Sequence, residues 1–325
     1  APQEDENIKT VLDGVISKLS PSKVEYVRGC AIRDTTVNEI AEVVEAASRS
    51  EVIIAVVGGS SARDFKTSYQ ETGAAIADEK SISDMECGEG FDRATLTLLG
   101  KQQDLLNALK ATGKPLIVVY IEGRPLDKVW ASEYADALLT ASYPGQEGGY
   151  AIADVLFGDY NPAGRLPVSV PRSVGQIPVY YNKKAPCNHD YVEQAASPLY
   201  TFGYGLSYTT FEYSDLQVMR KSPCYFEVSF KVKNTGSYDG EEVAQLYLRD
   251  EYASVVQPLR QLKCFERFFL KRGEEKEIFF TLTEKDLSII DRNMKRVVET
   301  GDFRIMIGAS SDDIRLTKDI SVESL

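Results

Sequence analysis

The hydrophobic positions in the first 207 residues alternate between two periods. Four segments place apolar residues three and four apart, as an amphipathic helix does: residues 8–19, 35–48, 101–113 and 145–159. Four others are short apolar or alternating runs typical of strands: residues 23–30, 51–59, 114–122 and 135–143. This order predicts an α/β domain over residues 1–207, with a mainly parallel sheet sandwiched by helices and a helix at 35–48 capped by Thr35 or Thr36.

From residue 208 the pattern changes to short strands in which apolar and polar residues alternate. About seven such runs follow one another, separated by turn sequences such as "NTGSYDG" and "KRGEE". Strands of this length and spacing are typical of an antiparallel β-sandwich of the immunoglobulin or fibronectin type III kind. We therefore expect a second, all-β domain at 208–325.

A long irregular segment, residues 60–95, interrupts the first domain and carries a cluster of acids. Asp84, Glu86, Glu89 and Asp92 stand close together there, in the sequence "SDMECGEGFDR". The segment follows the strand predicted at 51–59, and ligands in parallel sheets meet the loops beyond the carboxyl ends of strands. Long irregular loops inside compact domains are often functional. The cluster is therefore a solvated acidic turn, a metal site or half of a catalytic pair.

The composition of the chain limits which partners and which kinds of site we expect. The net charge is −12, which argues against a nucleic-acid partner because phosphate binding needs a basic surface. The chain has one histidine, His189, and five cysteines without a CxxC pair, so histidine-based catalysis, a zinc site and a disulfide scaffold are not indicated. The acids also lack a calcium-loop arrangement, so we expect no metal. Since no apolar run reaches transmembrane length, we expect no membrane span.

Several long motifs resemble glycoside hydrolase family 3, in its β-xylosidase and β-glucosidase branch. They are "ECGEGFDRATLTLLGKQQDLLNAL", "YPGQEGGYAIADVLFGDYNPAGRLPVSVPRS" and "PLYTFGYGLSYTTFEYS". The segment "VKNTGSYDGEEVAQLYL" is similar to the fibronectin type III-like domain that ends many of those enzymes. The resemblance covers nearly the whole chain in the family's own order. It implies a retaining, exo-acting glycosidase without a cofactor, acting on terminal β-xylosyl or β-glucosyl residues of an oligosaccharide or glycoside.

The resemblance also implies which carboxylate is the general acid/base. The family carries it in a motif like E-G-x-D-R, which falls on Glu89 here. Glu86 is the runner-up because this loop varies in length, and Asp84 and Glu71 are weaker candidates. Asp92 and Arg93 are expected to pair with each other or with neighbours and to hold the end of the loop.

The sequence "GGSSARDF" after the strand at 51–59 provides four candidate sugar-binding residues. They are Ser60, Ser61, Arg63 and Asp64. The sequence lacks both the GxGxxG pattern and the lysine of a phosphate-binding loop. Its side chains either reach a sugar hydroxyl or only form the rim of the pocket.

The nucleophile expected of this family is not apparent in the chain. The family begins with a (β/α)8 barrel that carries a nucleophilic Asp, and the nearest string here, "ISDM" at 82–85, lies in the irregular segment. The resemblance therefore implies a barrel domain as partner, in the same or another chain, and a secreted or periplasmic protein of bacterial type. The chain begins "APQEDENIK", which suggests a fragment, a processed chain or one chain of two. The alternative is a non-catalytic module that binds carbohydrate or protein.

Overall fold

The protein forms two compact units in a computed structural model, which describes all residues except 1–6, 62–69, 73–83, 88–91, 186–188 and 324–325. The α/β unit contains Ala1–Tyr160 and Pro171–Ile177, and the sandwich unit contains Asn161–Val170 and Pro178–Leu325. The division differs from the expected boundary at 207/208, because residues 161–170 and 178–207 group with the sandwich unit.

The α/β unit is built on a parallel sheet, as predicted. Its strands, in spatial order, are β1 (Ile53–Gly58), β2 (Leu116–Glu122) and β3 (Ala137–Ser142). All pairs are parallel, with Ile53 opposite Leu116 and Ile117 opposite Ala137. The three carboxyl ends therefore lie at one edge of the sheet.

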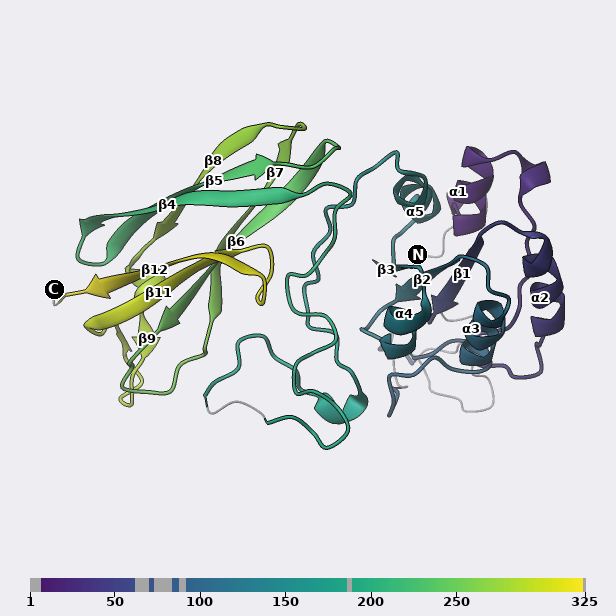
Figure 1. Cartoon of the computed structure of the whole chain (residues 1–325). Helices are drawn as coiled ribbons and strands as arrows, with labels where there is room; N and C mark the ends of the chain where they lie inside the picture. The colour runs from purple at the N-terminus through teal and green to yellow at the C-terminus, as the bar shows by residue number, and fades with distance from the viewer. Residues whose placement is uncertain (1–6, 62–69, 73–83, 88–91, 186–188, 324–325) are drawn as a thin grey trace. The chain divides into compact units, whose positions relative to one another are not determined.

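Five helices flank this sheet. They are α1 (Val11–Lys18), α2 (Ile40–Arg49), α3 (Gln102–Ala111), α4 (Val129–Tyr134) and α5 (Gly148–Phe157). Apolar residues of α2, α3 and α4 share one buried cluster with β1 and β2, including Leu106 and Val118, both fully buried. Helices α1 and α5 lie together on the opposite side of the sheet (Figure 1). The predicted helices on both faces are thus present.

Helices α1 and α5 approach each other closely because glycines line their contact. A Cβ added to Gly14 would lie 2.1 Å from the Gly149 carbonyl oxygen. One added to Gly149 would lie 1.9 Å from the Thr10 carbonyl oxygen. Thr10 and Asp13 form a reciprocal cap that fixes where α1 begins. Thr10 therefore takes part both in this cap and in the contact with Gly149.

Two local predictions are wrong. Residues 24–29 form no strand: a 3₁₀ turn, Pro21–Lys23, precedes them, and Gly29 turns the chain at φ +80° before an isolated bridge joins Cys30 to Asn38. Alternation predicted extended backbone here, but a strand also needs a partner. Helix α2 begins at Ile40 and not after Thr35 or Thr36, because Thr36 donates its backbone N–H to Asp34 in a separate turn at 2.9 Å.

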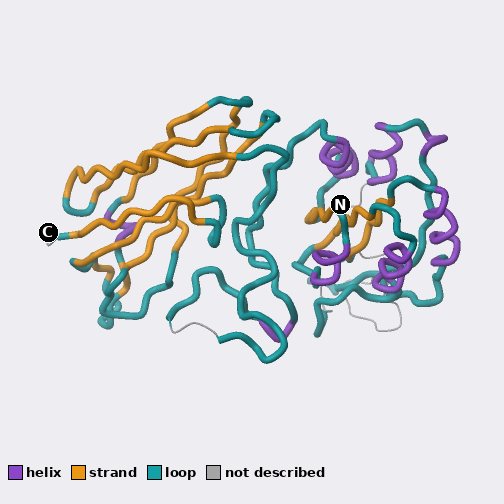
Figure 2. The backbone as a smooth tube through the Cα atoms, in the orientation of Figure 1, coloured by secondary structure: helices purple, strands orange, loops and turns teal. Residues whose placement is uncertain are grey.

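The sandwich unit has the seven predicted strands. They are β4 (Phe211–Ser222), β5 (Tyr225–Asn234), β6 (Gly240–Asp250), β7 (Gln261–Leu270), β8 (Glu275–Leu282), β11 (Gly301–Gly308) and β12 (Ile314–Val322). They form antiparallel sheets in the orders β12-β11-β6-β7 and β4-β5-β8 (Figure 2). The core between them includes Phe230, Leu246 and Ile305. The short elements are the 3₁₀ turn Val174–Gln176, α6 (Glu284–Leu287), β9 (Ile289–Ile290) and β10 (Arg296–Val297).

Residues 178–207 cover the outer face of β6 and so belong physically to the sandwich. Tyr181 stacks on Phe202, with ring centroids 4.1 Å apart, and meets Tyr247 edge-on at 6.1 Å. Gln245 donates its side-chain amide to the carbonyl oxygens of Ala309 and Gly203, at 2.7 and 3.3 Å. These contacts bury polar and aromatic side chains that would otherwise lie on an exposed sheet face.

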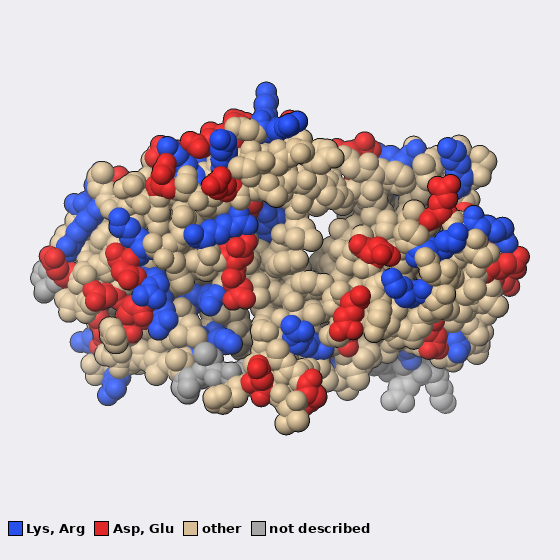
Figure 3. Space-filling model, viewed as in Figure 1, with Lys and Arg blue, Asp and Glu red and all other residues tan. Residues whose placement is uncertain are grey.

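The surface carries no broad field of one sign on the face shown in Figure 3, where acidic and basic side chains alternate. The cysteines that the structure describes, Cys30, Cys87, Cys224 and Cys264, are free thiols. Within the described ranges, no helix is long and apolar enough to cross a membrane.

Candidate active site

The described part of the acid segment lies at the carboxyl end of β1. The chain leaves β1 through Gly58 and Gly59, and the Glu86 backbone N–H donates to the Ser60 carbonyl oxygen at 2.8 Å. Residues 84–87 therefore stand at the sheet edge where the parallel topology predicts a ligand site.

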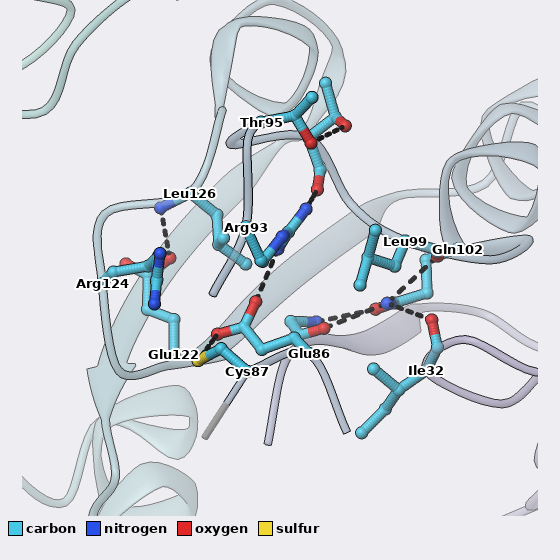
Figure 4. Close-up of polar contacts among 12 residues, drawn as sticks. Ile32, Glu86, Cys87, Arg93, Thr95, Leu99, Gln102, Glu122, Arg124 and Leu126 are labelled. Atoms are coloured by element: carbon cyan, nitrogen blue, oxygen red, sulfur yellow. Dashed lines mark hydrogen bonds and ion pairs between the residues drawn. The ribbon is translucent and has the colours of Figure 1, made fainter. Parts of the chain in front are cut away.

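Glu86 points inward and is ion-paired. Its side chain is 0% exposed, and its Oε2 accepts a hydrogen bond from Nη1 of Arg93 at 2.6 Å (Figure 4). The Arg93 side chain is 4% exposed and also donates to the Thr97 carbonyl oxygen. Position 59 must be glycine for this arrangement, since an added Cβ would lie 2.0 Å from Cδ of Glu86.

Asp92 and Arg124 form a second ion pair beside the first. Nη1 of Arg124 lies 2.7 Å from Oδ1 of Asp92. The Arg93 backbone N–H and then the Arg124 guanidinium lower the pKa of Asp92 below its usual range. Burial lowers the pKa of Arg124, but Asp92 and the nearby Cys87 outweigh this effect and raise it.

A buried pair, Glu122 and Lys128, shapes the turn that carries Arg124. Lys128 Nζ lies 2.7 and 2.6 Å from the two carboxylate oxygens of Glu122, and the Leu126 backbone N–H donates to Glu122 at 3.0 Å. Burial raises the pKa of Glu122 although Lys128 opposes it, and burial lowers the pKa of Lys128. The turn after β2 is therefore fixed by a buried ion pair and a backbone hydrogen bond to it.

Asp84 fixes the start of the described acid segment. Its carboxylate accepts three consecutive backbone N–H groups, of Ile32, Arg33 and Asp34, at 2.9, 2.7 and 3.2 Å. Partial burial alone would raise the pKa of Asp84, but these hydrogen bonds outweigh it and lower the pKa. Asp84 is therefore occupied as a structural acceptor.

Gln102, at the start of α3, closes the end of β1. Its amide oxygen accepts from the Gly58 N–H at 2.8 Å, and its amide nitrogen donates to the Gly58 carbonyl at 3.0 Å. A cavity of about 200 Å³ opens beside it, with Arg28, Cys30 and Gly59 among its lining residues. The candidate site thus borders a hollow at the sheet edge.

The predicted site residues are only partly within the described structure. Glu89, Arg63 and Asp64 lie outside the described residues. Ser60, the partly buried neighbour of Glu86, joins the acid segment, whereas the side chain of Ser61 is exposed. Glu71 is also exposed.

Sequence reasoning missed four residues that organise this edge: Arg124, Lys128, Glu122 and Gln102. A carboxylate at the last position of a buried strand was the available signal for Glu122, because an acid rarely ends an apolar run without a partner. The same reasoning points to a nearby cation, and Lys128 follows within six residues. Across the described ranges, no group of three or more acids, cysteines or histidines is arranged to hold a metal ion.

Comparison with known families identifies both units. The Glycosyl hydrolase family 3 C-terminal domain matches residues 3–208, and the Fibronectin type III-like domain matches residues 242–311. A β-xylosidase of Formosa agariphila is 40% identical over 316 residues, which are 94% of this chain. A periplasmic β-glucosidase of Salmonella typhimurium is 43% identical over 292 residues, or 85% of the chain.

Solved structures of β-glucosidases are also similar to this chain. A β-glucosidase from Erythrobacter marinus superposes with a TM-score of 0.84 at 35% identity, covering 97% of this chain and 43% of that one. A β-glucosidase from Listeria innocua in complex with glucose gives 0.80 at 30% identity, covering 99% and 43%.

The fold, the carboxylate-rich sheet edge and these relatives define the C-terminal domains of a glycoside hydrolase. The chain belongs to glycosyl hydrolase family 3. It spans 40% of the length of the Formosa relative and 35% of the Salmonella relative.

Proposed function

We propose that this chain supplies the general acid/base, Glu89, to a retaining, exo-acting β-glycosidase that releases terminal β-xylosyl or β-glucosyl residues. The nucleophilic carboxylate comes from an N-terminal (β/α)8 barrel domain, in the same or another chain. No cofactor takes part. The observation that carries the proposal is the position of residues 84–87, which hydrogen-bond to the chain leaving β1 at the ligand edge of a parallel sheet.

The reaction needs two carboxyl groups about 5–5.5 Å apart, on either side of the glycosidic bond. In the first step the barrel carboxylate attacks the anomeric carbon, and Glu89 donates its proton to the departing oxygen. In the second step Glu89, now ionised, takes a proton from a water molecule. The water oxygen attacks the anomeric carbon, and the bond between the sugar and the barrel carboxylate breaks. The products are the released sugar and the rest of the substrate, which now ends in a hydroxyl group.

Glu86 is less suited to this role than Glu89. Its carboxylate is inaccessible and already accepts a hydrogen bond from Arg93 at 2.6 Å. A general acid must present its carboxyl group to the leaving oxygen, whereas this carboxylate is buried against the guanidinium of Arg93. Glu86 would have to leave its partner to reach a sugar.

We also propose that the enzyme is secreted or periplasmic. The Salmonella relative is itself a periplasmic β-glucosidase. Cell fractionation of the producing organism, with an antibody against this chain, tests the proposal, and recovery in the cytoplasmic fraction contradicts it.

The activity test uses aryl β-xylosides and aryl β-glucosides. We expect almost no hydrolysis by this chain alone and enzyme-like rates when it is joined to its barrel domain. In that active enzyme, Glu89→Gln should lower kcat/KM by about 10²–10⁴-fold on substrates with poor leaving groups. Azide should partly restore turnover to Glu89→Ala on activated substrates, since an anion can then replace the missing base.

Three outcomes contradict the proposal. Enzyme-like turnover by this chain alone would place both carboxylates within it. If Glu86→Ala shows azide rescue and Glu89→Ala does not, Glu86 is the acid/base. Binding of an oligosaccharide without turnover in the joined protein would instead support an accessory module.

A further inference from the structure

Tyr143 is an exposed aromatic residue at the ligand edge of the parallel sheet. It directly follows β3, as Gly123 directly follows β2, and the two strands pair with Glu122 opposite Ser142. Tyr143 therefore lies at the carboxyl end of the sheet, where ligands of such sheets bind. It is 45% exposed. Because single exposed aromatic residues are common on protein surfaces, the support and the neighbours of this one decide what it can do.

The ring of Tyr143 is held in place despite its exposure. A Cβ added to Gly123 would lie 2.7 Å from Cε2 of Tyr143 and 2.8 Å from its hydroxyl oxygen, so the ring lies against the Gly123 backbone. Gly123 does not have a positive φ, so the ring and not the backbone conformation requires glycine there. Pro144 restricts the backbone of Tyr143, and Pro144 itself packs on Gly148, where an added Cβ would lie 2.4 Å from its Cγ. The chain thus presents a fixed aromatic surface.

Charged groups lie next to this aromatic surface along the chain. Arg124 directly follows Gly123, and its Nη1 lies 2.7 Å from Oδ1 of Asp92. Neither side chain is buried, so their N–H donors and carboxylate oxygens are accessible to a ligand. A sugar ring has C–H groups on its faces and hydroxyl groups around its rim. An aromatic ring bordered by hydrogen-bonding groups is suited to such a ligand.

The geometry of the reaction indicates which part of the substrate this surface meets. A retaining glycosidase has its nucleophile on one side of the glycosidic bond and its acid/base on the side of the leaving oxygen. In the proposed function the barrel domain supplies the nucleophile and this chain supplies the acid/base. The ligand edge of this chain therefore faces the leaving group.

We propose that Tyr143 is a specificity-determining residue that stacks on the leaving sugar, the unit attached through the scissile oxygen. This inference rests on the proposed function. It concerns the binding of the leaving group and not the transfer of the proton, so the two can be tested separately.

The test compares two substrates that differ in the leaving group, in the active enzyme that contains this chain and its barrel domain. Xylobiose or cellobiose has a sugar as its leaving group, whereas the methyl β-glycoside of the same sugar has only methanol. Both leaving groups are alcohols that need a proton, so acid catalysis contributes to both reactions. Tyr143→Ala removes the stacking surface and should lower kcat/KM about tenfold for the disaccharide, but less than about twofold for the methyl glycoside.

Tyr134 provides a matched control at the opposite end of the same strand. It is also 45% exposed, but it precedes β3 and so lies at the amino end of the sheet. Tyr134→Ala should leave the ratio of the two kcat/KM values unchanged. Tyr143→Phe keeps the ring and should stay within about twofold of the unsubstituted enzyme on both substrates. Tyr143→Leu, which still covers Gly123 but lacks the ring, provides the measurement if Tyr143→Ala does not fold.

The outcomes separate this inference from the proposed function. A loss confined to the disaccharide supports the stacking role. Equal losses on both substrates would overturn it and indicate that Tyr143 supports the structure or packs against the barrel domain, and no loss on either substrate would also overturn it. The proposed function would stand in both cases. It fails, together with this inference, if the unsubstituted joined protein does not hydrolyse the aryl glycosides.

Discussion

At the scale of single residues, the buried pair of Glu122 and Lys128 shows how the edge of the sheet is held. Their side chains are 5% and 1% exposed, and Lys128 also lies 4.7 Å from the centroid of the Tyr120 ring. Burial disfavours the charge on both residues, which moves their pKa values toward each other. Each charge is therefore tolerated only because the other is present.

Lys128→Met should destabilise the protein by about 3 kcal/mol at pH 8, because Glu122 is left buried without its cation. Burial already raises the folded-state pKa of Glu122 above its unfolded value, and losing Lys128 raises it further. An ionised, buried Glu122 destabilises the folded state. The stability lost in Lys128→Met should therefore shrink as the pH falls through the raised pKa of Glu122. Urea unfolding at pH 8 and pH 5 measures this.

The control for that prediction is Glu122→Gln with Lys128→Met. This double variant leaves no buried charge. It should therefore lose less stability than Lys128→Met, and the loss should be the same at both pH values. A loss for Lys128→Met that is the same at pH 8 and pH 5 would contradict the account.

At the scale of elements, the contact of α1 with α5 depends on the absence of two Cβ atoms. Gly14 lies inside α1, where alanine would ordinarily stabilise a helix by about 0.5–1 kcal/mol. Here the added Cβ would lie 2.1 Å from the Gly149 carbonyl oxygen and 3.0 Å from Cβ of Ala153. The helices would have to separate, which costs more than the helix gains.

Gly14→Ala should therefore destabilise the protein by about 1–3 kcal/mol, the usual cost of overpacking. Gly164→Ala is the comparison, because no atom lies within 4 Å of a Cβ placed there. Thermal unfolding should show a lower midpoint for Gly14→Ala and little change for Gly164→Ala. A raised midpoint for Gly14→Ala would mean that helix propensity outweighs the contact.

The elements also show what sequence patterns can predict. Period-two alternation predicted all seven long strands of the sandwich, because it records which side of each strand is buried. The same pattern failed at residues 24–29, where extended backbone finds no neighbouring strand. At the site, topology correctly predicted that residues 84–87, a described part of the acid segment, lie at the carboxyl end of β1. The pairing of Arg124 with Asp92 could not be predicted, because it joins residues 32 apart through tertiary packing.

At the scale of the whole molecule, the family boundary and the physical boundary differ. The Glycosyl hydrolase family 3 C-terminal domain matches up to residue 208, yet residues 178–207 pack on β6 of the sandwich. Tyr247 is fully buried through contacts of this kind. Residue 208 is therefore a boundary in the sequence of the family and not in the packing of this protein.

A chain of residues 161–325 should consequently be more stable than a chain of residues 208–325. The shorter chain loses Tyr181 and Phe202, and with them the aromatic cover of Tyr247. Burying these two large side chains stabilises the longer chain by about 3–6 kcal/mol. Guanidinium unfolding of both chains tests this, and equal midpoints would show that the cover adds nothing.

Gln102 has a consequence for solubility. β1 is an outer strand of the described sheet, and outer strands present unpaired backbone groups that can recruit a strand from another molecule. The Gln102 amide occupies the N–H and the carbonyl of Gly58, the last residue of β1, as a neighbouring strand would. A strand added by a second molecule must therefore stop before Gly58, so intermolecular aggregation along β1 cannot extend into the candidate site.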